Sequence, residues 1–84
     1  MSRRRIVSEH DQREWLRRNV RIHRAAKGLS ARAAGERVGM NLRHWQRIEA
    51  ASSNVTLETL ARLCNALEVD IVQLLREPSI GVGH

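Results

Sequence analysis

The 84-residue sequence predicts an all-helical domain, and three features lead to that prediction. Apolar residues recur at intervals of three and four, which is the period of one helix face. No stretch alternates apolar and polar residues as a half-buried strand does. Ser, Asn, Thr and Asp residues stand directly before the apolar stretches, where helix N-caps are expected. A chain of this length has room for one hydrophobic core, so we expect one domain.

The longest helix is expected to begin after a cap among residues 8–11 and to continue to about residue 26. Its apolar stripe comprises Trp15, Leu16, Val20, Ile22, His23 and Ala26. Arg17 and Arg21 fall on the opposite side. Lys27 places a cation in the last turn and Gly28 readily adopts positive φ, so together they predict the end of this helix.

Two short helices follow, joined by a tight turn. Ser30 is the expected N-cap of a helix over residues 31–38, which ends at Gly39, and Asn41 caps a third helix that reaches about residue 50. At about 100° per residue, Trp45 and Ile48 of the third helix point to one side, toward the core. The residues that point to the other side are Arg43, Gln46, Arg47 and Ala50.

Two further helices complete the prediction. Thr56 follows a loop over residues 51–55 and caps a fourth helix. Its expected buried side comprises Leu57, Leu60, Ala61, Leu63, Cys64 and Leu67. Asp70 caps a short last helix over residues 71–76, which Pro78 closes.

The last helix carries more apolar residues than one small core readily covers. They are Ile71, Val72, Leu74 and Leu75. Small domains that lack disulfides or a structural metal ion often gain stability from a partner subunit. The single cysteine, Cys64, cannot form an intramolecular disulfide. These residues are therefore candidates for the interface of a homodimer, and a monomer that buries them in its own core is the alternative.

The chain divides into a basic N-terminal arm over residues 1–11, a domain over residues 12–77 and a C-terminal tail over residues 78–84. Residues 1–28 hold nine Lys and Arg against three acids, whereas residues 51–84 hold two against four. A basic surface attracts polyanions such as nucleic acid, and a solvated basic surface explains the same charge equally well. The run of Arg3, Arg4 and Arg5 either contacts DNA or is a solvated tail. With no apolar signal segment and no apolar run that could cross a bilayer, we expect a cytoplasmic protein with no membrane partner.

Residues 29–48 read as a capped helix, a glycine turn and a second capped helix. Two short helices at this spacing form a helix-turn-helix unit, whose second helix lies in the DNA major groove. Arg and Gln side chains have the geometry to read base edges, Arg on guanine and Gln on adenine. An ordinary amphipathic helix with a polar face shows the same pattern, so these residues alone leave both interpretations open.

Six motifs distributed over residues 20–74 decide between the two interpretations. They are Val20-x-x-His23-Arg24, Gly28-Leu29-Ser30, Gly39-Met40-Asn41, Trp45-x-x-Ile48-Glu49, Leu57-Glu58-Thr59-Leu60 and Ala66-Leu67-Glu68-Val69. In these motifs and their spacing the sequence resembles the phage-repressor type (Cro/C1, XRE) helix-turn-helix DNA-binding family of bacterial regulators. The resemblance implies an all-α, five-helix lambda-repressor-like DNA-binding domain with its helix-turn-helix unit at about residues 30–50.

The resemblance also implies roles for individual residues. The base-reading positions fall on Leu42, Arg43, Gln46 and Arg47. Leu42 stands at the border of the groove-facing side, where it either touches a thymine methyl or packs. The positions expected at DNA phosphates are Arg17, Arg21, Ala31, Asn41, Ser52, Ser53 and Asn54. Ala31 stands where the family often has Gln, so only its backbone amide can donate a hydrogen bond to a phosphate. Arg24 and Glu49 are expected to form an architectural ion pair between the first helix and the end of the third.

Three departures from the family pattern bear on the fold. Ala34-Gly35 replaces a leucine-alanine pair, which predicts a close approach of the second and third helices with the bulky Trp45 in compensation. Ala51 replaces a glycine after the third helix. His23 replaces a leucine. We expect it to lie at the edge of the core with its hydrogen bonds made, rather than to act as a pH switch.

We therefore expect a transcription regulator that binds double-stranded DNA as a homodimer on a palindromic operator, with half-sites about 34 Å apart. The alternative is an antitoxin or protein-interaction module that autoregulates its operon. No Gly-rich phosphate loop, acid pair or nucleophile motif is visible, so we do not expect an enzyme. Cys64 and the four histidines lack ligand spacing, so no metal or cofactor is expected. No small-molecule ligand is expected either.

Overall fold

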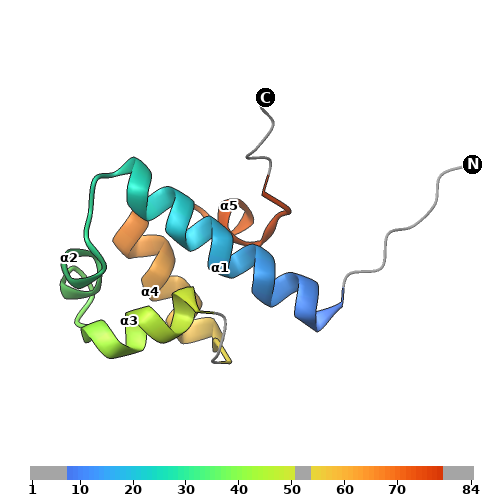
Figure 1. The fold of residues 1–84 in the computed structure, drawn as a ribbon, viewed down its shortest axis with the longest axis horizontal. Coiled ribbons are helices and arrows are strands. Elements are labelled where there is room, and N and C mark those ends of the chain that lie inside the picture. Colours follow the sequence, from blue (N-terminus) through green and yellow to red (C-terminus); the bar gives the residue numbers. More distant parts are fainter. Residues whose placement is uncertain (1–7, 51–53, 79–84) are drawn as a thin grey trace, which may run out of the picture.

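The computed structural model describes residues 8–50 and 54–78. These residues form five α-helices and no strand, which confirms the predicted all-helical fold. The helices are α1 (Glu9–Ala26), α2 (Ala31–Glu36), α3 (Leu42–Glu49), α4 (Leu57–Leu67) and α5 (Ile71–Leu75) (Figure 1). Helix α1 packs against α3, α4 and α5, while α2 packs against α3 and α4. No helix among the described residues is long and apolar enough to cross a membrane.

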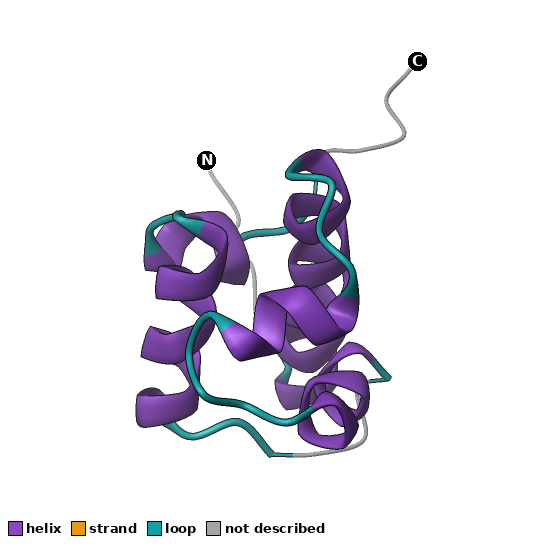
Figure 2. Ribbon diagram, turned by 90° about the vertical axis from the view of Figure 1, so that its left-hand side faces the viewer, coloured by secondary structure: helices purple, strands orange, loops and turns teal. Residues whose placement is uncertain are grey.

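Each helix begins at a polar N-cap whose side chain accepts a hydrogen bond from the backbone N–H three residues later. The five caps are Ser8, Ser30, Asn41, Thr56 and Asp70. All five lie within the stretches where the sequence predicts them, because capping depends only on chemistry within one turn. Figure 2 shows the short loops that separate the helices.

The helix bounds differ from the predictions in two places. Helix α1 begins at Glu9 after the cap Ser8, as predicted, and so includes residues 9–11, which the division of the chain assigns to the arm. Helix α2 ends at Glu36, because the backbone of Arg37 to Gly39 turns toward α3. Helix α5 ends at Leu75 and is followed by the extended residue Arg76.

The core is formed by side chains from all five helices and by Met40 in the turn before α3. Its buried apolar side chains are Leu16, Val20, Ala34, Met40, Trp45, Ile48, Leu60, Leu63, Ala66, Leu67 and Leu74. Trp45 is the largest fully buried side chain among the described residues. The first-helix stripe is narrower than predicted, since Trp15, Ile22 and His23 are half-buried and Ala26 is exposed.

The predicted buried side of α4 is wrong at two positions. Leu57 is 80% exposed, because the first residue of α4 extends past the core. Ala61 is exposed as well, since it is rotated about 100° from the buried Leu60. Ala66 takes the buried place instead.

The predicted dimer interface is wrong at Leu74. This residue is fully buried in the core, because the short α5 lies against α1 and Leu74 is on the contacting side. Leu75 is half-buried against the core. Of the four predicted residues, only Ile71 and Val72 are exposed.

A buried asparagine that sequence reasoning overlooked joins α1 to the end of α5. The side-chain amide of Asn19 donates hydrogen bonds to the carbonyls of Leu74 and Arg76, both at 2.8 Å. Gln12 donates to the carbonyl of Leu75 at 2.6 Å. These bonds satisfy carbonyls at the end of α5 that lack partners within the helix. The signal in the sequence is an amide that interrupts the apolar stripe between Leu16 and Val20.

Candidate nucleic-acid interface

The turn between α2 and α3 is held by backbone contact at Gly35. The amide of Met40 donates to the carbonyl of Gly35 at 2.9 Å. A Cβ atom at Gly35 would lie 2.4 Å from the carbonyl oxygen of Met40, so only glycine fits. The close approach predicted at Ala34-Gly35 is thus present, and its partner is the backbone that leads into α3. Gly39 completes the turn with φ +70°, a conformation that favours glycine.

Helix α3 has one face in the core and one face in solvent. Trp45, Ile48 and Glu49 are buried. The residues exposed on the other side are Arg43, Gln46, Arg47 and Ala50. Leu42 is half-buried, at the border between the two faces. The helix therefore presents two arginines and a glutamine on one exposed surface, which we call the α3 polar face (Arg43, Gln46 and Arg47).

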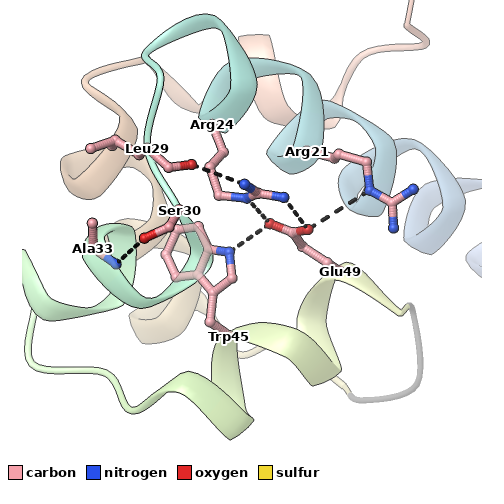
Figure 3. A network of polar contacts seen from close by, with 7 residues as sticks. All are labelled: Arg21, Arg24, Leu29, Ser30, Ala33, Trp45 and Glu49. Atoms are coloured by element: carbon pink, nitrogen blue, oxygen red, sulfur yellow. Dashed lines mark hydrogen bonds and ion pairs between the residues drawn. The ribbon is translucent and has the colours of Figure 1, made fainter.

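Two contacts fix α3 in its orientation. The indole N–H of Trp45 donates to Glu49 Oε2 at 2.6 Å, one helical turn away. The guanidinium of Arg24 on α1 donates to both carboxylate oxygens of Glu49, from Nε to Oε2 at 2.5 Å and from Nη2 to Oε1 at 3.0 Å. Figure 3 shows Trp45 and Arg24 converging on this carboxylate. The rotation of α3 about its axis is thereby tied to α1.

The same arginine also holds the connection between α1 and α2. Arg24 Nη1 donates to the carbonyl of Leu29 at 2.9 Å, directly before the N-cap Ser30 (Figure 3). One side chain on α1 thus contacts both ends of the helix-turn-helix unit. The family resemblance implies the Arg24–Glu49 pair, but it implies neither the bond to Leu29 nor the part of Trp45.

The network shifts the pKa of both charged groups. Burial alone acts to raise the pKa of Glu49, but the hydrogen bonds from Arg24 and Trp45, with the charges of Arg24 and Arg21, outweigh it and lower that pKa. The hydrogen bond to Glu49 raises the pKa of Arg24 against the opposing effect of burial. Both groups therefore stay charged at neutral pH.

The residues predicted at DNA phosphates are placed less uniformly. Arg21 is 58% exposed on α1 and its Nε lies 3.7 Å from Glu49 Oε1, beside the Arg24 pair (Figure 3). Arg17 is instead half-buried and pairs with Glu14 on its own helix. Asn54 is exposed and its Oδ1 accepts from Arg13 at 2.5 Å. Ser52 and Ser53, together with Ala51, lie outside the described residues.

The two remaining phosphate candidates stand at the starts of helices. Asn41 is exposed and caps α3 by accepting from the amide of His44 at 2.8 Å. Ala31 is the first residue of α2 and is half-buried. Among the described residues, no group of His, Cys, Asp and Glu side chains is placed to hold a metal ion.

Comparisons with known proteins agree with this geometry. The model of a helix-turn-helix domain family matches residues 15–77. The crystal structure of a hypothetical transcription factor, NHTF, from Neisseria is similar, with a TM-score of 0.79 and 26% identity over 94% of this chain and 91% of that chain. The crystal structure of the clp gene regulator ClgR from C. glutamicum is similar, with a TM-score of 0.71 and 30% identity over 76% of this chain and 83% of that chain. No curated protein matches.

Proposed function

Because the chain belongs to the helix-turn-helix domain family, we propose that it is a DNA-binding regulator of transcription whose α3 polar face selects the bases of its operator. The similar solved structures are those of a hypothetical transcription factor and a gene regulator, which favours a DNA-binding regulator over an enzyme. The observation that carries the proposal is the division of α3, which buries Trp45 and Ile48 and leaves Arg43, Gln46 and Arg47 exposed.

The side chains of the α3 polar face suit the major groove. An arginine reaches the O6 and N7 of guanine with two parallel hydrogen bonds, and a glutamine reaches the N6 and N7 of adenine. Arg43 and Arg47 lie four residues apart, so they stand one turn apart on the same side of α3. Leu42, at the border of this face, would contact a thymine methyl group.

Phosphate contacts would position α3 in the groove without selecting bases. Arg21 is the best placed of the predicted cations, because it is exposed on α1 next to the Arg24–Glu49 pair. The backbone amide of Ala31, the side chains of Asn41 and Asn54, and Ser52 and Ser53 stay candidates for the same role. Arg17 would have to leave Glu14 to take part.

The regulator would act as a homodimer on a palindromic operator. A two-fold protein reads two half-sites about 34 Å apart, so that two recognition helices enter successive major grooves on one side of the DNA. The support is the small size of the domain and the apolar side chains that it leaves in solvent, Leu57, Ile71 and Val72.

Selection of bound DNA from a random pool, repeated at two salt concentrations, tests the proposal. The expected result is a palindromic consensus, with a contribution from phosphate contacts that falls as salt rises. A variant with Arg43 and Arg47 both changed to Ala should lose the consensus while it retains weak binding to all sequences. An unchanged consensus in that variant would contradict the assignment of α3 as the reading helix.

A further inference from the structure

An apolar hollow lies beside the most exposed leucine of the chain. The hollow has a volume of about 200 Å³ and is lined by Glu9, Gln12, Arg13, Leu16, Ile48, Asn54, Val55, Leu60 and Leu75. We call it the α1–α4 hollow. Leu57, which is 80% exposed, comes two residues after Val55 and three before Leu60, both of which line the hollow. Figure 1 shows the start of α4 and the beginning of α1 toward the same end of the molecule.

The lining of the hollow suits an apolar side chain. Its walls are formed by Leu16, Ile48, Val55, Leu60 and Leu75. The polar groups at its rim already have partners. Gln12 donates to the carbonyl of Leu75 at 2.6 Å, and Arg13 pairs with Glu9 and donates to Asn54. A charged ligand would have to break these bonds, whereas a leucine side chain would leave them intact.

We propose that the α1–α4 hollow receives Leu57 of a second copy of the chain, and that the second copy receives Leu57 of the first. A two-fold dimer uses the same patch on both subunits, so a protruding residue and the hollow that accepts it must lie in one patch. Leu57 stands in the chain between Val55 and Leu60, two residues that line the hollow, and this proximity is the basis for placing both in one patch. The inference rests on the proposed function, because it names the surface of the dimer that would read the palindrome.

Charges around the patch are complementary between copies. Glu58 follows Leu57 and its side chain is almost fully exposed, while Arg13 is on the rim of the hollow and 43% exposed. When Leu57 enters the partner's hollow, the adjacent Glu58 reaches the rim where the partner's Arg13 stands. Arg13 keeps Glu9, and Glu58 keeps Arg62, as exposed partners within one copy, so the contact across the two-fold axis adds to these pairs and does not replace them.

The start of α5 offers the competing surface, because Ile71 and Val72 are exposed there. The hollow is at the other end of that helix, where Leu75 forms part of its wall. Leu75 thus belongs to the proposed interface because it lines the hollow. The sequence makes it a candidate for another reason, the large number of apolar residues in the last helix.

Sedimentation velocity of the full chain over a concentration series tests the proposal. Leu57→Glu and Val72→Glu form a matched pair, since each places a carboxylate on an exposed position of a helix first turn, where it suits the helix dipole. We expect the wild type to dimerise, Leu57→Glu to raise the dimer dissociation constant by about tenfold or more, and Val72→Glu to change it little. Circular dichroism of both variants checks that each one folds.

A charge exchange tests the same surface without touching Leu57. Glu58→Arg and Arg13→Glu should each weaken the dimer, and the double variant should restore much of the loss because the opposite-charge contacts return. If the loss of dimer affinity in the double variant equals the sum of the losses in the two single variants, the proposed pairing of these residues is contradicted.

The results separate this inference from the proposed function. A wild-type dimer that persists in Leu57→Glu and dissociates in Val72→Glu places the interface at the start of α5, which overturns the inference and leaves the proposed regulator unaffected. A wild-type monomer at all concentrations, with a palindromic consensus still found by DNA selection, also overturns the inference alone. Loss of any DNA consensus overturns the proposed function, whatever the state of association.

Discussion

The guanidinium of Arg24 and the carboxylate of Glu49 form a two-bond ion pair across 25 positions of the sequence, and this pair joins α1 to the end of α3. The side chain of Glu49 is only 10% exposed and that of Arg24 is 21% exposed. Removal of either partner therefore leaves the other charge in a site that water reaches poorly.

We expect Arg24→Met to lower the free energy of unfolding by about 2–4 kcal/mol, somewhat less than for a fully buried pair because Arg24 keeps some contact with solvent. Urea denaturation measures the change. Arg21→Met is the control, since Arg21 faces the same carboxylate at 3.7 Å but is 58% exposed, and should cost less than about 1 kcal/mol. Equal losses in the two variants would show that the two-bond pair is not the dominant contact.

The same pair predicts how stability changes with pH. The pKa of Glu49 is lowered from its ordinary value of 4.5 in the folded protein. A carboxyl group of this kind stabilises the fold above its ordinary pKa, and the contribution is lost as the pH falls through the folded-state pKa. Thermal melts from pH 7 to pH 3 measure this contribution. At neutral pH the melting temperature of the wild type should lie above that of Glu49→Gln, and the difference should close below about pH 4.5.

The pKa values of Glu14 and Glu68 are also lowered, by hydrogen bonds from Arg17 and Lys27 respectively. Both carboxylates are present in wild type and in Glu49→Gln, so their contributions cancel in the comparison. A gap that stays constant down to pH 3 would rule out the charged form of Glu49 as the stabilising species.

Gly35→Ala should disturb the turn between the helices of the unit. Its Cβ would stand 2.4 Å from the carbonyl oxygen of Met40, so the backbone must move, at a cost of about 1–3 kcal/mol. Gly39→Ala in the same turn meets no atom within 4 Å and carries only the strain of φ +70°, about 1 kcal/mol. DNA binding should fall further in Gly35→Ala than in Gly39→Ala, as fluorescence anisotropy would measure.

Asn19→Leu tests the link between α1 and α5. The leucine has a similar size but leaves the carbonyls of Leu74 and Arg76 without their hydrogen bonds, at a cost of about 1–3 kcal/mol in the free energy of unfolding. Asn65→Leu provides the comparison, because Asn65 is exposed on α4. If chemical denaturation finds both changes neutral, the two bonds contribute no net stability.

Arg47→Ala and Arg21→Ala should affect DNA binding in different ways. We expect Arg47→Ala to cost about 1–3 kcal/mol of binding free energy and to relax selection at one base pair. Arg21→Ala should weaken binding to all sequences alike and reduce the salt dependence by about one phosphate contact. Binding-site selection and salt titrations of both variants measure these effects, and relaxed selection in Arg21→Ala would reverse the two assignments.

The parts of the fold that follow from local chemistry were predictable from the sequence. The caps Ser30, Asn41, Thr56 and Asp70 each act within one turn, so the residue type before an apolar stretch suffices to place them. The two faces of α3 follow from helix periodicity in the same way. The roles of its exposed residues in DNA reading remain predictions.

The parts that were not predictable depend on where helices lie relative to one another. Leu57 and Leu60 share a face of α4 by their spacing, yet only Leu60 is covered because the core ends between them. Leu74 and Val72 look alike in the sequence, and the packing of α5 on α1 decides which is buried. Asn19 interrupts an apolar stripe, and its purpose becomes clear only with the end of α5 beside it.

Trp45 is fully buried and its ring nitrogen is bonded to Glu49, while Trp15 is half-buried on α1. An indole held against a carboxylate in a dry site fluoresces differently from one that water reaches. Displacement of α3 from α1 would break that bond and admit water, so the emission of this ring would change even where helix content does not. The fluorescence of Trp45 thus reports whether α3 is packed against α1.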